Sequence, residues 1–154
     1  MNTREIAIID KILKNSQLSV QDFREVEVLG NDAFDYIREF LAKTSDVRTI
    51  INGLNLLTRL ATQFAQDSAG PRLPELFEIA SSYLIDPTLE VRIKAMNIVV
   101  AALWTLRDLG RGLDAVGGKT RVLGVLRTAS AAESRVEQRE QWDAIIRQLD
   151  SGWG

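Results

Sequence analysis

The chain has 154 residues, of which 45% are hydrophobic and 26% are charged, and its formal net charge is -2. This composition is typical of one globular domain, and the near balance of charge does not favour a sequence-independent grip on nucleic acid. Cysteine and histidine are both absent, which excludes disulfides, zinc sites, thiol nucleophiles and histidine-based catalytic triads.

No segment of the sequence is typical of a membrane span or a secretory signal. The longest apolar run, residues 98–103, is far shorter than the roughly 20 residues that cross a bilayer. The first fifteen residues place charged side chains among their isoleucines, whereas a signal sequence needs an uninterrupted apolar stretch. We therefore expect a cytoplasmic protein without a membrane segment.

Apolar residues recur at spacings of three and four along nearly the whole chain, which predicts an all-α fold of about eight helices. Ser19 followed by Asp22 is a capping box, and Gly30 is placed to close that helix. Ser45 or Asp46 caps the fourth helix, and a glycine-rich stretch after residue 109 is expected to be the loosest part of the chain. The helices are expected at 3–14, 19–30, 32–43, 45–66, 74–84, 86–109, 120–128 and 132–149, with a turn at 67–71.

Two parts of the chain resemble each other. Residues 51–57 align with residues 93–99 at a spacing of 42, and Phe34–Asp35 align with Phe77–Glu78 at a spacing of 43. A unit of one shorter and one longer helix therefore occurs at 32–66 and again at 74–109. Two amphipathic helices can also match by chance, because both follow the same 3.6-residue period.

The stretch from Asp86 to Ala95, with Pro87, Val91 and Arg92, resembles the start of the second helix of a HEAT repeat. The resemblance to the HEAT and armadillo families covers residues 32–109. It implies an α–α superhelix forming a single domain, with capping helices at 1–30 and hairpin units at 32–66, 74–109 and 113–150. It also implies a concave binding face lined by the second helices, in a scaffold or adaptor without enzymatic activity.

Polar residues on the two long helices are the candidate partner-binding site. Their spacing places those of each helix in one stripe opposite the apolar face, which we expect to be exposed. Armadillo repeats hold extended peptides with asparagines, and the resemblance implies such a role for Asn55 and Asn97. Such a stripe can also be only the solvated face of an amphipathic helix. The candidates are Arg48, Asn52, Asn55 and Arg59 on one helix, and Lys94 and Asn97 on the other.

Two further segments have alternative interpretations. The helix at 86–109 is apolar nearly all round, which indicates a central core helix or, near Val100 and Trp104, the wall of a groove for a partner. The stretch from Arg107 to Arg127 is rich in basic residues and can meet phosphate or an acidic partner, or be a solvated connection.

These patterns together predict a non-enzymatic macromolecule-binding module, most simply a protein–protein adaptor. No catalytic residue, cofactor or metal site is predicted, and the expected partner is another protein. One alternative is an inhibitor of the immunity or antitoxin type that neutralises a toxin. Another is a helical enzyme that works through carboxylates and Mg²⁺.

Overall fold

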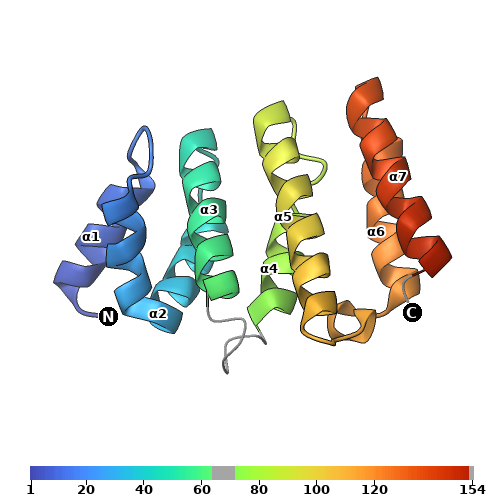
Figure 1. Cartoon of the computed structure of the whole chain (residues 1–154). Coiled ribbons are helices and arrows are strands. Elements are labelled where there is room, and N and C mark those ends of the chain that lie inside the picture. Colours follow the sequence, from blue (N-terminus) through green and yellow to red (C-terminus); the bar gives the residue numbers. More distant parts are fainter. Residues whose placement is uncertain (64–71, 153–154) are drawn as a thin grey trace. The chain divides into compact units, whose positions relative to one another are not determined.

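The computed structural model describes residues 1–63 and 72–152. Within these ranges it contains seven α-helices, one 3₁₀ turn and no strand, which confirms the all-α prediction (Figure 1). The chain divides into two compact units, Met1–Arg72 and Leu73–Gly154. The expected helix end near Gln66 and the expected turn at 67–71 lie outside the described residues. The elements are α1 (Thr3–Leu13), α2 (Val20–Leu41), α3 (Val47–Gln63), α4 (Arg72–Ser81), α5 (Leu89–Asp108), η1 (Leu113–Val116), α6 (Lys119–Ala132) and α7 (Val136–Gly152).

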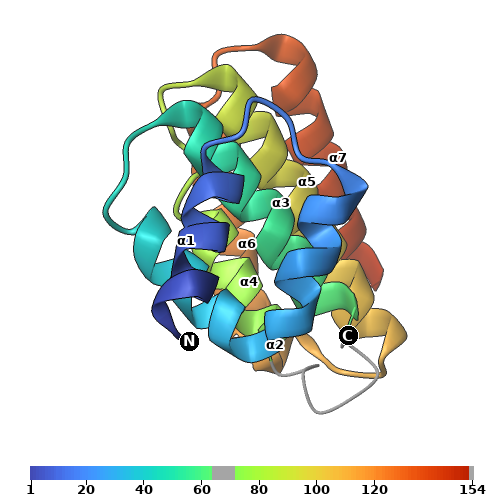
Figure 2. The same cartoon turned by 90° about the vertical axis from the view of Figure 1, so that its left-hand side faces the viewer.

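In the first unit, α2 is broken at Gly30. This residue adopts φ 57° and ψ −130°, and a positive φ is accessible to glycine because it has no Cβ. The chain reverses there, so the part of α2 before Gly30 forms a hairpin with α1, and the part after it forms a hairpin with α3 (Figures 1 and 2). The helices expected at 19–30 and 32–43 are therefore both present, and they follow one another without a connecting loop.

Polar side chains fix where the helices of the first unit begin. The Ser19 hydroxyl accepts a hydrogen bond from the Asp22 N–H at 3.1 Å, and the Asp22 carboxylate accepts one from the Ser19 N–H at 2.9 Å. This is the predicted capping box. The Asp46 carboxylate accepts from the Thr49 N–H at 3.0 Å and caps α3. Each bond satisfies a backbone N–H group that the first turn of a helix leaves without a partner.

The second unit contains two further hairpins, α4 with α5 and α6 with α7, joined through η1 (Figure 1). α5 begins at Leu89, later than the predicted residue 86, because Asp86 and Pro87 belong to the preceding turn. The Asp86 carboxylate accepts from the Thr88 N–H at 2.8 Å and stabilises that turn. The interior is apolar and includes the buried side chains of Leu76, Phe77, Val99, Leu103, Leu126 and Trp142.

The glycine-rich connection between α5 and α6 is more ordered than its composition suggests. Leu113 and Val116 of η1 are buried, so the 3₁₀ turn packs onto the second unit. Gly117 and Gly118 then lead with positive φ directly into α6. Burial of two apolar side chains therefore offsets the flexibility that the glycines confer.

Candidate functional site

The predicted polar stripe of the first unit lies on α3, and one of its members is structural. Asn52 is only 2% exposed. Its side-chain amide donates to the carbonyl oxygens of Leu13 at 3.0 Å and Asn15 at 2.8 Å. These carbonyls follow the last turn of α1, where a helix leaves C=O groups without partners. The prediction that Asn52 lies on an exposed surface is therefore wrong, because its amide satisfies the end of α1.

Arg59 is also engaged within the first unit. Its Nε donates to the Glu27 carboxylate at 2.7 Å, and its guanidinium lies 5.9 Å from the centroid of the Phe23 ring. Both contacts fasten α3 to α2, although the Arg59 side chain is still largely exposed. Arg48 is exposed and Asn55 is half-buried on the same helix. Of the predicted residues on α3, Arg48 and Arg59 are therefore exposed and Asn55 is partly exposed.

In the second unit, one of the two predicted residues lines a groove. Asn97 is exposed and Lys94 is half-buried on α5. Asn97 and Val100 line an open groove of about 410 Å³ between α5 and α7, and Trp104, the other residue named for a groove wall, is not among the residues that line it. The groove is mainly apolar, and its only other polar lining residue is Gln141. The remaining lining residues are Met96 and Ala101 of α5 and Ala144 and Ile145 of α7.

The α7 side of this groove was not predicted. A weak signal was present, because Trp142, Ile146 and Leu149 follow one another at spacings of four and three and already account for one apolar face. Ile145 extends this apolar surface to the adjacent side of α7. An apolar stripe that is wider than the face buried in the core indicates a second contact surface.

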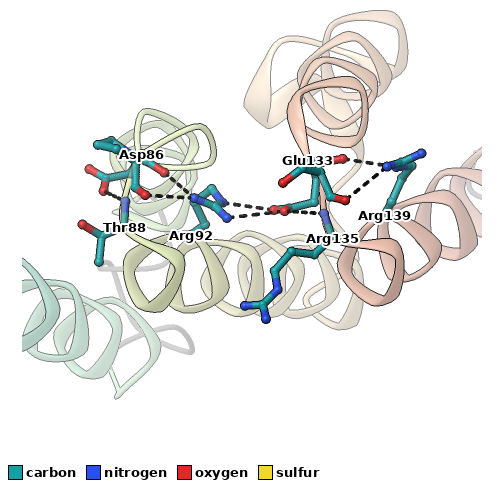
Figure 3. A network of polar contacts seen from close by, with 8 residues as sticks. Asp86, Thr88, Arg92, Glu133, Arg135 and Arg139 are labelled. Carbon is teal, nitrogen blue, oxygen red and sulfur yellow. Dashed lines mark hydrogen bonds and ion pairs between the residues drawn. The ribbon is translucent and has the colours of Figure 1, made fainter.

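A buried ion pair fixes how the two hairpins of the second unit meet (Figure 3). Arg92 donates from Nε to the Glu133 carboxylate at 3.0 Å, and from Nη1 to the Asp86 carbonyl oxygen at 2.9 Å. Glu133, in the turn between α6 and α7, is 6% exposed and also accepts from the Arg135 N–H. The network joins the start of α5 to the turn before α7, the two helices that line the groove.

The electrostatics of Glu133 follow from these contacts. Burial alone would raise the pKa of its carboxyl group, because the charged form loses hydration. The hydrogen bonds from Arg92 and from the Arg135 N–H, together with the charges of both arginines, outweigh that effect and lower the pKa overall. Glu133 is therefore held as a carboxylate, as a structural ion pair requires.

Two other hollows occur in the second unit. One of about 610 Å³ lies between α4 and α6, and we call it the α4–α6 hollow. The other, of about 550 Å³, lies at the corner between α6 and α7, where several of the polar groups bond to one another. There the Ser130 hydroxyl donates to Asp143 at 2.7 Å, and Arg139 donates from Nε to the Glu133 carbonyl oxygen at 3.1 Å.

Three basic residues of the predicted basic stretch contact groups of the second unit. Arg121 donates from Nη1 and Nη2 to the two oxygens of the Glu78 carboxylate at 2.6 and 2.7 Å. Lys119 donates to the Asp150 carbonyl oxygen at 3.2 Å, and Arg127 lies 4.0 Å from the Asp150 carboxylate. These contacts do not test the alternative of a phosphate site, which stays a prediction.

In residues 1–63 and 72–152, no group of three Asp or Glu side chains could hold a metal ion. In the same ranges, every helix is too short or too polar to cross a membrane. Comparisons with models of protein families, with curated proteins and with solved structures give no match.

Proposed function

We propose that the chain is a non-enzymatic protein-interaction module that binds its partner at the groove between α5 and α7. The observation that carries this proposal is the groove itself, which leaves apolar side chains of two helices open to solvent. Concave sites with mostly apolar walls and a few polar groups are the usual form of binding pockets. The corner between α6 and α7 is more polar, and its Ser130 and Asp143 bond to each other.

The groove offers a simple mode of binding. Asn97 and Gln141 stand on opposite walls, and each side-chain amide can both donate and accept a hydrogen bond. A partner segment can therefore place apolar side chains against Val100 and Ile145 while its backbone bonds to the amides. Lys94 precedes Asn97 by one helical turn and can contact the same segment.

We further propose that the hairpins stack as an α–α superhelix of the HEAT or armadillo type, whose second helices line a concave face. Two hairpins in each unit support this arrangement, as does the position of α5 and α7, both second helices of their hairpins, on one groove. In this arrangement Arg48, Asn55 and Arg59 of α3 extend the partner surface.

Two exposed alanines on opposite walls of the groove provide the test. Ala101→Glu on α5 and Ala144→Glu on α7 each place a charge in the groove, and Ala7→Glu on the exposed face of α1 is the matched control. Tagged variants are used to capture partners from the source cells, followed by mass spectrometry. We expect both groove variants to lose the same specific partner and the control to retain it, with equal melting temperatures for all three. Retention of every partner by both groove variants would refute the proposal.

A further inference from the structure

Two glycines in the interior of helices differ in what surrounds them. At Gly53 of α3, an added Cβ would come within 2.7 Å of Leu41 Cδ2, so the packing of α3 against α2 requires glycine there. At Gly124 of α6, an added Cβ would meet nothing within 4 Å. A glycine inside a helix costs about 0.5–1 kcal/mol relative to alanine. No contact within the described residues accounts for that cost at Gly124.

Gly124 lines the α4–α6 hollow, and so does an exposed apolar side chain. Ile85, in the turn that follows α4, is 60% exposed, whereas most isoleucines of the chain are buried or half-buried. The same patch therefore carries a protruding apolar residue and, at Gly124, an open space that a side chain can fill. Thr128, one turn after Gly124, keeps this part of the hollow wide because its side chain is small.

Two charged side chains of opposite sign line the hollow. Glu78 and Arg121 form the ion pair described above, and their side chains are 49% and 43% exposed. A surface with one charge of each sign can face a second copy of itself without repulsion, since rotation by a two-fold axis brings each charge toward its opposite.

We propose that the α4–α6 hollow is the contact surface of a symmetric homodimer. Across a two-fold axis, Ile85 of each copy enters the hollow of the other copy beside Gly124, and Glu78 of each copy faces Arg121 of the other. Such an isologous contact uses the same patch on both chains, which is the commonest arrangement among soluble oligomers. The open helix glycine and the exposed isoleucine then have one common explanation.

The dimer contact is independent of the proposed partner site. α4 and α6 are the first helices of their hairpins, and they lie on the other side of the second unit from α5 and α7 (Figure 2). A homodimer of this kind leaves both α5–α7 grooves open, so one assembly presents two partner sites.

The mass of the full chain in solution tests the proposal. Sedimentation equilibrium at micromolar concentrations should give twice the chain mass of 17.2 kDa. Ile85→Asp and Gly124→Leu should each give a single chain, and Val28→Asp, which changes an exposed valine of α2 in the first unit, should remain a dimer. Gly124→Leu is the sharper variant. It replaces a helix glycine with a better helix former, so the single chain should keep its helix content by circular dichroism, which separates loss of the dimer from misfolding.

Charge variants test the two-fold arrangement. Glu78→Arg leaves two cations on the patch and Arg121→Glu leaves two anions, so each variant alone should be a monomer. An equimolar mixture of the two should recover the dimer mass. A single-chain mass for the unmodified protein, a dimer of Gly124→Leu, or no recovery on mixing would each overturn the proposal.

Discussion

The two long helices α3 and α5 align with each other in the sequence, yet the structure uses their polar faces differently. On α3, Asn52 and Arg59 bind groups of the first unit itself. On α5, Asn97 is exposed beside an apolar groove. The difference shows that a polar stripe on an amphipathic helix has two distinct uses, to satisfy neighbouring elements or to meet a partner, and that helical spacing alone does not distinguish them.

The cause of the difference lies in α1. Its last turn continues into Lys14, which keeps a helical backbone, and no glycine closes the helix. The carbonyl oxygens of Leu13 and Asn15 are therefore bonded by the side chain of Asn52. The last turns of α1 and α4 both contain backbone hydrogen bonds, and they differ at the last helical residue. The Ser81 carbonyl oxygen of α4 accepts from the Leu84 N–H at 3.3 Å, whereas the Leu13 carbonyl oxygen of α1 accepts from Asn52. The end of α4 is therefore bonded by its own backbone and not by the amide of a distant side chain.

The largest expected effect distinguishes the ion pairs of the two units. Arg92→Met leaves the Glu133 carboxylate, only 6% exposed, without its guanidinium partner, and should lower the free energy of unfolding by about 3–5 kcal/mol. Arg59→Met breaks the more exposed pair with Glu27 and should cost about 1 kcal/mol or less, because water can solvate that carboxylate. Urea denaturation followed by circular dichroism measures both. Equal losses would mean that the Arg92 pair does not fix the second unit.

The next effect compares the two asparagines directly. Asn52→Ala removes two hydrogen bonds and leaves carbonyl oxygens at the end of α1 without their donors, so we expect a loss of about 2–3 kcal/mol in the free energy of unfolding. Asn97→Ala, the same substitution at an exposed site, should change it by no more than about 0.5 kcal/mol. The same denaturation experiment applies. A similar loss at both positions would remove the distinction between a structural and an open stripe.

These two asparagines also mark what the sequence can and cannot predict. The capping box at Ser19 was predicted because its two partners lie three residues apart, and the helices because their apolar spacing is local. The role of Asn52 depends on a carbonyl of Leu13, 39 residues away, and nothing in the local pattern encodes that contact. A groove was one of two interpretations of α5, beside a central core helix. The α7 wall of this groove depends on how α7 packs against α5, which is a long-range contact that the local pattern does not encode.

A smaller effect concerns binding. The variant carrying both Asn55→Ala and Asn97→Ala should bind the partner roughly tenfold more weakly, because each lost hydrogen bond contributes about 1 kcal/mol. The structure sharpens this prediction, since only Asn97 lies beside a groove and Asn55 is half-buried. We therefore expect Asn97→Ala alone to account for most of the loss measured by calorimetry. A loss caused mainly by Asn55→Ala would place the principal contact on α3 of the first unit.

The smallest effect is the dependence of stability on acid, which tests the buried pair without removing the arginine. The pKa of Glu133 is lower in the folded chain than in the unfolded chain. As the pH falls, the unfolded chain therefore binds a proton at this carboxyl group before the folded chain does. Stability from this group is present above the unfolded pKa, near 4.5, and is lost as the pH falls through the lower folded value.

Glu133→Gln removes this titration. The free energy of unfolding of this variant should be lower at pH 7 than that of the unmodified chain, and it should fall less steeply below pH about 5. Glu140→Gln, on an exposed position of α7, should follow the unmodified curve. Parallel curves for the Glu133→Gln variant and the unmodified chain down to pH about 3 would show that Arg92 does not stabilise this carboxylate, and the groove walls would then need another support.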